Sequence, residues 1–257
     1  MEQQNKKNKV TLVEFLEMIK TDEYENDWYS RIMTKLAVYC TYVIAKTNLS
    51  ANMATFIMLL IGLASGVAFY FDKMLLGVIL MQLWYLFDWI DGAIARLKNQ
   101  CSKTGWYYDH IIHLINHPIF FVSIAAGLYR QTHLTYILIF GLTAAYAHIV
   151  DVSASDTYMM VLFKNLLDNK IPFVKKPHKN AKNFIALKLH FPGIMNVFTL
   201  SVVLDYIGRA AGFQSNCNIT KYVIIAYGIL LPIYVILRLT KHITQGAIDR
   251  EYDSLSK

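Results

Sequence analysis

Charged side chains are scarce in this chain: they make up 17% of its 257 residues, whereas a soluble domain usually devotes about a quarter of its residues to charge. Cysteine is scarcer still, because the three present are too few and too scattered for a disulfide framework or a zinc cluster. The first 30 residues lack an uninterrupted apolar stretch behind a basic start, so we expect no cleavable signal peptide. We also find no internal repeat, low-complexity run or second domain. These absences argue against a soluble enzyme, a disordered tail and a disulfide-stabilised scaffold.

Apolar residues, in contrast, make up 55% of the chain, and their distribution predicts membrane-spanning helices. A span needs about 20 apolar residues. Six stretches are long enough, of which the fifth is the shortest: 53–72, 75–97, 105–129, 133–160, 192–208 and 222–240. The sequence therefore predicts an all-α membrane protein with six transmembrane helices.

Two shorter apolar stretches, 10–19 and 31–46, precede the first span. Both suit amphipathic helices that lie in the membrane interface, although a short first span is the competing interpretation of 31–46. We expect a cytoplasmic N-terminal segment with interfacial helices over 1–51, a transmembrane catalytic domain over 52–240 and a cytoplasmic tail over 241–257.

The distribution of basic residues predicts the orientation. With the N-terminus in the cytoplasm, 21 of the 25 Lys and Arg residues lie on the cytoplasmic side, as the positive-inside rule requires. The most basic segment, 164–188, is interpreted as a topogenic loop beside anionic headgroups; alternatively, Lys182 or Lys188 guides an anionic substrate. No folded basic surface with a helix or strand that could contact nucleic-acid bases is visible, so we expect no nucleic-acid partner.

Three carboxylates converge near the cytoplasmic membrane surface. Asp88 and Asp91 lie near the end of the second span, and Asp109 lies near the start of the third. On helices, Asp88, Asp91, Gly92 and Ala95 form one stripe and Gly105, Asp109 and His113 form another. A short turn over 97–104 brings the stripes face to face. Their mutual repulsion requires neutralisation, and oxygen ligands suit Mg²⁺ or Mn²⁺ that holds substrate phosphates.

The small residues on these stripes have two interpretations. Gly92, Ala95 and Gly105 allow either close helix packing or the approach of a flat, phosphate-bearing ligand. Arg96, beside the stripe, is either a phosphate ligand or a cation that extends to the membrane surface.

This pattern resembles the signature of the CDP-alcohol phosphotransferase family. The matching residues are Asp88-x2-Asp91-Gly92-x2-Ala95-Arg96-x8-Gly105-x3-Asp109. Residues 48–55, NLSANMAT, are similar to the family segment that opens the first span, although Ala51 stands where a proline is usual. Six spans preceded by an interfacial helix are the architecture of that family.

The resemblance implies an alcohol that attacks the β-phosphate of a CDP-linked donor and releases CMP at a site with two metal ions. It assigns metal binding to Asp88, Asp91 and Asp109. The residues that it places around the substrate are Gly92, Ala95, Arg96 and Gly105, together with Asn52 and Thr55. It further implies a homodimer, in the cytoplasmic membrane if the source is bacterial, with phospholipid or lipid-linked phosphodiester synthesis as the process.

One departure concerns the last motif position, where the family has an aspartate that is usually assigned as the general base and this chain has His113. An imidazole is a competent base at neutral pH and a metal ligand; alternatively, the substitution leaves a catalytically impaired homologue. Asp109-His110 resembles the pair of the choline and ethanolamine branch, so His110 is a second base candidate. His117, one turn deeper, is interpreted as packing or as a partner of the site.

Other polar residues in the spans are less specific. Asp151, Ser153 and Asp156 line either an acceptor pocket or a water-filled vestibule, and Arg238 is either an interfacial anchor or an anion ligand. The lipid is either the donor, as CDP-diacylglycerol, or the acceptor, as diacylglycerol; a soluble polyol acceptor is a further alternative.

A divalent-cation transporter could use the same carboxylates. That function predicts further polar residues across the bilayer, and the chain offers Asp72 and Asp205 near the outer edge.

Overall fold

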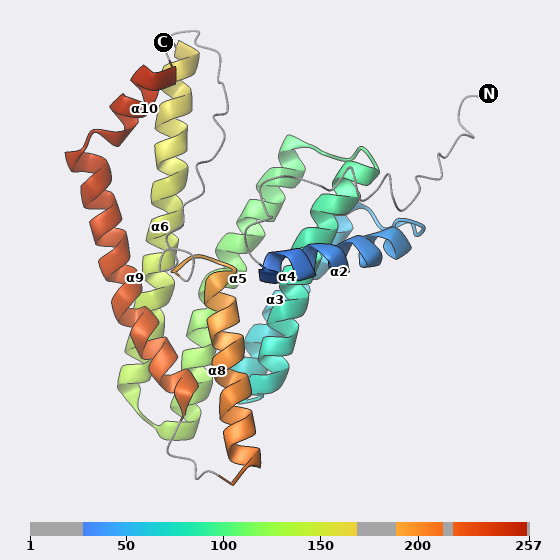
Figure 1. Cartoon of the computed structure of the whole chain (residues 1–257), viewed down its shortest axis with the longest axis vertical. Helices are drawn as coiled ribbons and strands as arrows, with labels where there is room; N and C mark the ends of the chain where they lie inside the picture. Colours follow the sequence, from blue (N-terminus) through green and yellow to red (C-terminus); the bar gives the residue numbers. More distant parts are fainter. Residues whose placement is uncertain (1–27, 169–188, 213–217, 256–257) are drawn as a thin grey trace. The chain divides into compact units, whose positions relative to one another are not determined.

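The computed structural model describes residues 28–168, 189–212 and 218–255, and every regular element within these ranges is an α-helix (Figure 1). The expected helix over 10–19 and most of the basic segment lie outside the described residues. The helices are α2 (Trp28–Ile44), α3 (Ala51–Tyr70), α4 (Met74–Leu97), α5 (Lys103–Thr132), α6 (Thr135–Asp168), α8 (Gly193–Ala210), α9 (Ile219–Thr244) and α10 (Ala247–Leu255).

Each predicted span corresponds to one long helix, with differences only at the helix ends. Five of them, α3, α4, α5, α6 and α9, are long and apolar enough to cross a membrane, which makes this a multi-pass membrane protein. Among the described residues, α8 is not in this set: it has 18 residues and includes Asn196, Asp205 and Arg209, which lower its apolar character. The stretch expected to lie in the interface forms α2, which is a shorter apolar helix.

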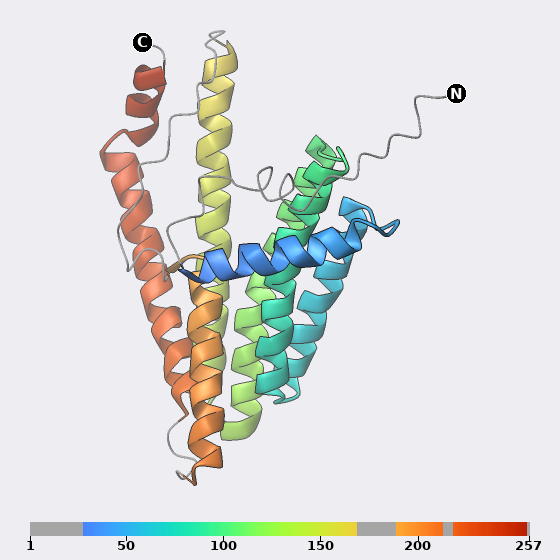
Figure 2. The same cartoon turned by 45° about the vertical axis from the view of Figure 1, so that its right-hand side comes forward.

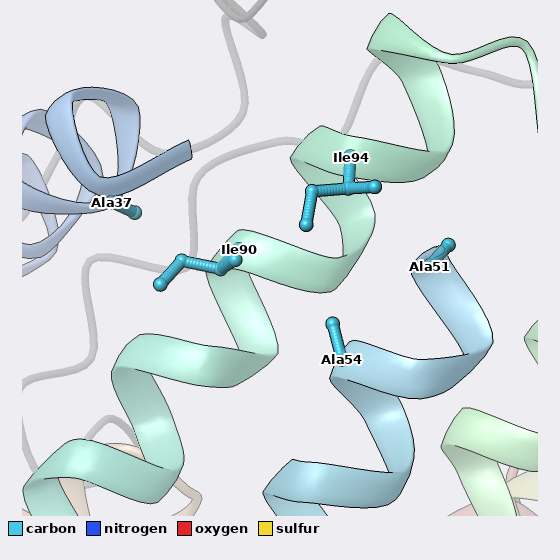
Figure 3. Packing of buried hydrophobic residues seen from close by; sticks show 5 residues of the cluster. All are labelled: Ala37, Ala51, Ala54, Ile90 and Ile94. Atoms are coloured by element: carbon cyan, nitrogen blue, oxygen red, sulfur yellow. The ribbon is translucent and has the colours of Figure 1, made fainter. Parts of the chain in front are cut away.

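The helices divide between two compact units, 1–61 with 82–112 and 62–81 with 113–257, so the boundary falls within α3, α4 and α5. In the first unit, Ala51 and Ala54 of α3 pack against Ile90 and Ile94 of α4, and Ala37 of α2 joins them (Figure 3). Ile90 and Ala37 point toward one another. The alanines have no bulk beyond Cβ, so α3 approaches α4 closely.

Backbone acceptors and donors near the α4–α5 turn also hold the first unit together. Lys98 Nζ donates hydrogen bonds to the carbonyl oxygens of Thr47 and Leu49 at 2.9 and 2.6 Å. The backbone N–H of Ala51 donates to Gln100 Oε1 at 2.9 Å. The turn after α4 is therefore tied to the segment that enters α3.

In the second unit, α9 lies beside α6 and next to α8 (Figures 1 and 2). The two helices approach closely at Gly228 of α9. A Cβ on this residue would lie only 2.6 Å from the carbonyl oxygen of Phe140. Farther along, the rings of Tyr158 and His242 are 5.1 Å apart, so α6 and α9 run parallel. The pairs Phe198–Tyr227 and Asp205–Thr220 show that α8 runs antiparallel to α9.

Candidate active site

The end of α4 and the first turns of α5 carry the predicted acidic site, and both belong to the first unit. The turn between them is as short as predicted, with Leu97 ending α4 and Lys103 beginning α5. Ser102 caps α5, because its Oγ accepts a 2.9 Å hydrogen bond from the backbone N–H of Gly105. Gly105 and Asp109 consequently follow each other one turn apart on one face of α5.

Asp88 and Asp109 approach each other across the two helices. Each offers a carboxylate oxygen within 4.8 Å of the other's, and His113, one turn after Asp109 on α5, belongs to the same group of candidate ligands. Ligand atoms on opposite sides of one Mg²⁺ are about 4.2 Å apart, since each lies about 2.1 Å from the ion. The spacing of these half-buried side chains is close to that of a coordination shell, so they fit a divalent cation.

Asp91 is the most buried of the three carboxylates, with 6% of its surface exposed. Asp88 and Asp109 lie near enough to act on it electrostatically. Three carboxylates in a largely buried site repel one another unless a proton or cation neutralises them. Asp91 is not in the group of atoms within 4.8 Å, so its predicted role as a ligand stays a prediction.

Thr55, predicted to line the nucleotide pocket, contacts the acidic site itself. It is 4% exposed, and its Oγ1 lies 2.8 Å from Asp91 Oδ2 and 3.0 Å from the carbonyl oxygen of Ala51. This hydroxyl orients the Asp91 carboxylate. Ala95, assigned to the same pocket, packs against the apolar cluster of α2, α3 and α4.

The two motif glycines have open surroundings. A Cβ on Gly92 would meet only the guanidinium of Arg96, at 3.5 Å or more. A Cβ on Gly105 would lie 3.1 Å from Ser102 Oγ and 3.5 Å from Asn52 Oδ1. Within the described ranges, neither position has another helix backbone within contact distance, so close packing among these residues does not account for Gly92, and the space beside it suits a ligand.

The two base candidates occupy different surroundings. The ring of His110 stacks on Trp106, with centroids 5.8 Å apart and an interplanar angle of 16°. His113 instead belongs to the candidate metal group and contacts His117, whose Nε2 lies 3.2 Å from His113 Nδ1. His117 contacts His148 in turn. Sequence reasoning missed His148, although an ionisable residue within a span is a functional candidate by default.

A second polar group lies in the second unit around Asp151, which is buried. Arg238 donates hydrogen bonds to Asp151 at 2.5 Å and to Ser155 at 2.9 Å. His190 Nδ1 is 3.7 Å from Asp151 and His190 Nε2 is 2.7 Å from the Tyr234 hydroxyl. Burial lowers the pKa of His190; Arg238 lowers it too, whereas Asp151 acts in the opposite direction.

Arg238 thus bonds to a buried carboxylate of the protein itself, and its role as an interfacial anchor or as an anion ligand stays a prediction. Ser153 and Asp156 are exposed. His190, Ser155 and Tyr234 were not identified from the sequence, since their partners lie on other elements.

A sequence model of the family described as CDP-alcohol phosphatidyltransferase matches residues 48–212, which is more than half of the chain and includes the whole motif. This chain belongs to the CDP-alcohol phosphatidyltransferase family. The sequence-based resemblance is thereby confirmed at the level of the family.

Similar proteins include an archaeal synthase and a mycobacterial synthase of known structure. The archaetidylinositol phosphate synthase of Pyrococcus horikoshii is 28% identical over 98 residues, which cover 38% of this chain and about half, 52%, of that protein. The crystal structure of Mycobacterium tuberculosis phosphatidylinositol phosphate synthase with CDP-DAG bound matches with a TM-score of 0.55 and 14% identity, and the match covers 82% of this chain and 92% of that one. At this identity the structural likeness shows a shared fold.

Proposed function

We propose that this protein is an integral membrane transferase that moves a substituted phosphate from a CDP-linked donor to an alcohol acceptor and releases CMP. Membership of the family supports the reaction class. The observation that carries the proposal for this chain is the meeting of Asp88, Asp109 and His113, with ligand atoms within 4.8 Å of one another.

In this proposal Asp88, Asp91, Asp109 and His113 hold Mg²⁺ or Mn²⁺. Bound divalent cations neutralise the donor pyrophosphate and the charge that develops on CMP. Thr55 keeps the Asp91 carboxylate in place. Gly92 leaves room for the phosphates, and Arg96, whose guanidinium lies beside Gly92, donates hydrogen bonds to a phosphate oxygen.

His113 takes the place of the aspartate that the family resemblance leads us to expect. Its lone pair serves either as a cation ligand or as the acceptor of the proton from the attacking hydroxyl. We favour His113 over His110 because His113 belongs to the acidic group, whereas the His110 ring is stacked on Trp106. Comparison of His113→Ala with His110→Ala separates the two candidates: the larger loss of CMP release is expected for His113→Ala.

The comparisons support a lipid on the donor side. The solved relative holds CDP-DAG, and the curated relative is named for an inositol phosphate product. We therefore propose a CDP-linked lipid donor and a soluble polyol acceptor, with inositol phosphate as the first acceptor to assay. The polar group of Asp151, Ser155 and Arg238 offers donors and acceptors for such hydroxyl or phosphate groups.

We also propose that α8 is the sixth span. Because α6 and α9 run parallel and both qualify as spans, the chain between them has to return across the membrane. Among the described residues of that segment, α8 has 18 residues, or about 27 Å of helix. This topology places the ends of α4, α6 and α9 in the cytoplasm with the active site; the homodimer stays a prediction.

The acidic residues near the outer edge do not favour a cation transporter. Asp205 accepts hydrogen bonds from the backbone N–H groups of Ile219 and Thr220 and from the Thr220 hydroxyl, at 2.6, 2.9 and 2.7 Å. It therefore holds the start of α9. Asp72 accepts a hydrogen bond from Gln131. Both carboxylates have structural partners.

The test is CMP release by detergent-purified protein from CDP-diacylglycerol, with inositol phosphate, inositol or no acceptor, and from CDP-choline with diacylglycerol. We expect release with the lipid donor and Mg²⁺ or Mn²⁺, abolition by EDTA, and a loss of about 10²-fold or more in Asp91→Asn. Asp249→Asn is the matched control, because Asp249 lies on α10 outside the spans. Uptake of Mn²⁺ into liposomes that contain the purified protein, without any CMP release, would contradict the transferase and support the transporter.

A further inference from the structure

Three histidines of the second unit form a line that begins at His113 of the candidate metal group. His113 Nδ1 lies 3.2 Å from His117 Nε2, and His117 Nδ1 lies 3.0 Å from His148 Nε2. His117 and His148 are each 7% exposed. The first two residues are one turn apart on α5, and the third comes from α6.

The contacts restrict where the ring protons lie. A neutral imidazole has one N–H donor and one acceptor nitrogen, so both hydrogen bonds must point the same way along the line when all three rings are neutral. If His113 uses Nε2 as a lone pair, its proton is on Nδ1 and is donated to His117 Nε2. His117 Nδ1–H is then donated to His148 Nε2. The observed pairing of atoms satisfies this order throughout.

The rings are also held in orientation. Phe191 stacks on His117 with centroids 3.7 Å apart and an interplanar angle of 2°, and it meets His148 edge-on at 5.0 Å. The ring of Phe121 also lies near His148, with centroids 6.3 Å apart. Rotation of the His117 ring would break both hydrogen bonds and its stacking on Phe191, so the line is a rigid support for the His113 ring.

We propose that His117 and His148 are positioning residues that keep the proton of His113 on Nδ1 and leave the Nε2 lone pair for the active site. The proposal rests on the proposed function for the use of that lone pair, which is needed equally by a cation ligand and by a base. It explains how a histidine serves at this position: an aspartate has acceptor oxygens whatever its surroundings, whereas an imidazole must be held in the right tautomer.

The variants are His117→Phe, which keeps an aromatic ring against Phe191 but removes the acceptor, and His117→Gln, whose amide oxygen restores one. The control is His242→Phe, at the end of α9. Mn²⁺ affinity is measured by calorimetry on the substrate-free protein, and kcat and KM by CMP release. We expect His117→Phe to weaken Mn²⁺ binding or lower kcat by about 10- to 100-fold, with His117→Gln close to the wild type.

A second experiment, in a His113→Asp background, separates a positioning role of His117 from a general structural role. In His113→Asp the ligand at this position no longer depends on a tautomer, so adding His117→Phe is expected to change Mn²⁺ affinity and kcat by less than about threefold. A loss that persists in this background, or no loss in His117→Phe beyond that of His242→Phe, would overturn the proposal. Protein that binds Mn²⁺ with this dependence but releases no CMP would contradict the proposed function and leave the positioning role supported.

Discussion

At the scale of single residues, the hydrogen bond between Thr55 and Asp91 changes the role assigned to a motif position. The resemblance places Thr55 near the nucleotide, but its hydroxyl contacts a buried carboxylate. A partner of this kind fixes the rotamer of a metal-binding aspartate and stabilises its charge. We therefore propose that Thr55 acts through Asp91, and its predicted place in the nucleotide pocket stays a prediction.

We expect Thr55→Val, which preserves shape but removes the hydroxyl, to reduce CMP release by about 10- to 100-fold and to lower the free energy of unfolding by about 1–3 kcal/mol. Thr55→Ser keeps the hydroxyl and is expected to retain most of the activity. The measurements are CMP release and thermal unfolding in detergent. Full activity and full Mn²⁺ affinity in Thr55→Val would show that Asp91 needs no such partner.

At the scale of helices, two glycines that both lie within long apolar helices have different roles. Gly127 of α5 lies against α3, since a Cβ there would be 2.0 Å from the carbonyl oxygen of Phe69. Among the residues that the structure describes, the end of the Arg96 side chain is what lies near Gly92 of α4. The first glycine permits two helices to pack, and the second leaves space in the candidate site.

Replacing each glycine with alanine therefore separates packing from function. Gly127→Ala is expected to lower the free energy of unfolding by about 1–3 kcal/mol because the new methyl group meets the backbone. Gly92→Ala is expected to leave the unfolding temperature unchanged and to raise KM for the CDP-linked donor. Thermal unfolding and CMP release measure both effects. A destabilised Gly92→Ala with normal KM would place another helix at this position.

Helix existence was predictable at this scale because apolar length is a local property of the sequence. Five of the predicted spans match α3, α4, α5, α6 and α9, and the short turn predicted over 97–104 matches the α4–α5 connection. The packing role of each glycine was not predictable, since it depends on which backbone lies opposite.

At the scale of the whole molecule, membrane topology is the main consequence of the helix arrangement. The contact of Tyr158 with Glu251 at 2.5 Å and with the His242 ring brings the ends of α6 and α9 together. Residues of α10 must then lie on the same side of the membrane as the end of α6.

We expect a membrane-impermeant maleimide to label Cys101, which is exposed in the α4–α5 turn, only from the cytoplasmic side. A cysteine introduced at Asp253 should show the same sidedness, and one at Lys73 the opposite, each in a background in which Cys40, Cys101 and Cys217 are replaced by serine. The measurement is labelling of right-side-out and inverted vesicles. Opposite sidedness at Cys101 and position 253 would mean that α8 does not cross.

The sequence by itself determined that this is a helical membrane protein, that five of its segments are long and apolar enough to span, and that Asp88 and Asp109 meet beside a short turn, because span length and helical spacing need only neighbouring residues. Only the tertiary structure decided that Thr55 supports Asp91, that Arg238 bonds to Asp151 and that His117 and His148 stand behind His113. Those contacts join different helices, and the choice of partner across a helix interface depends on how the helices pack rather than on any local pattern.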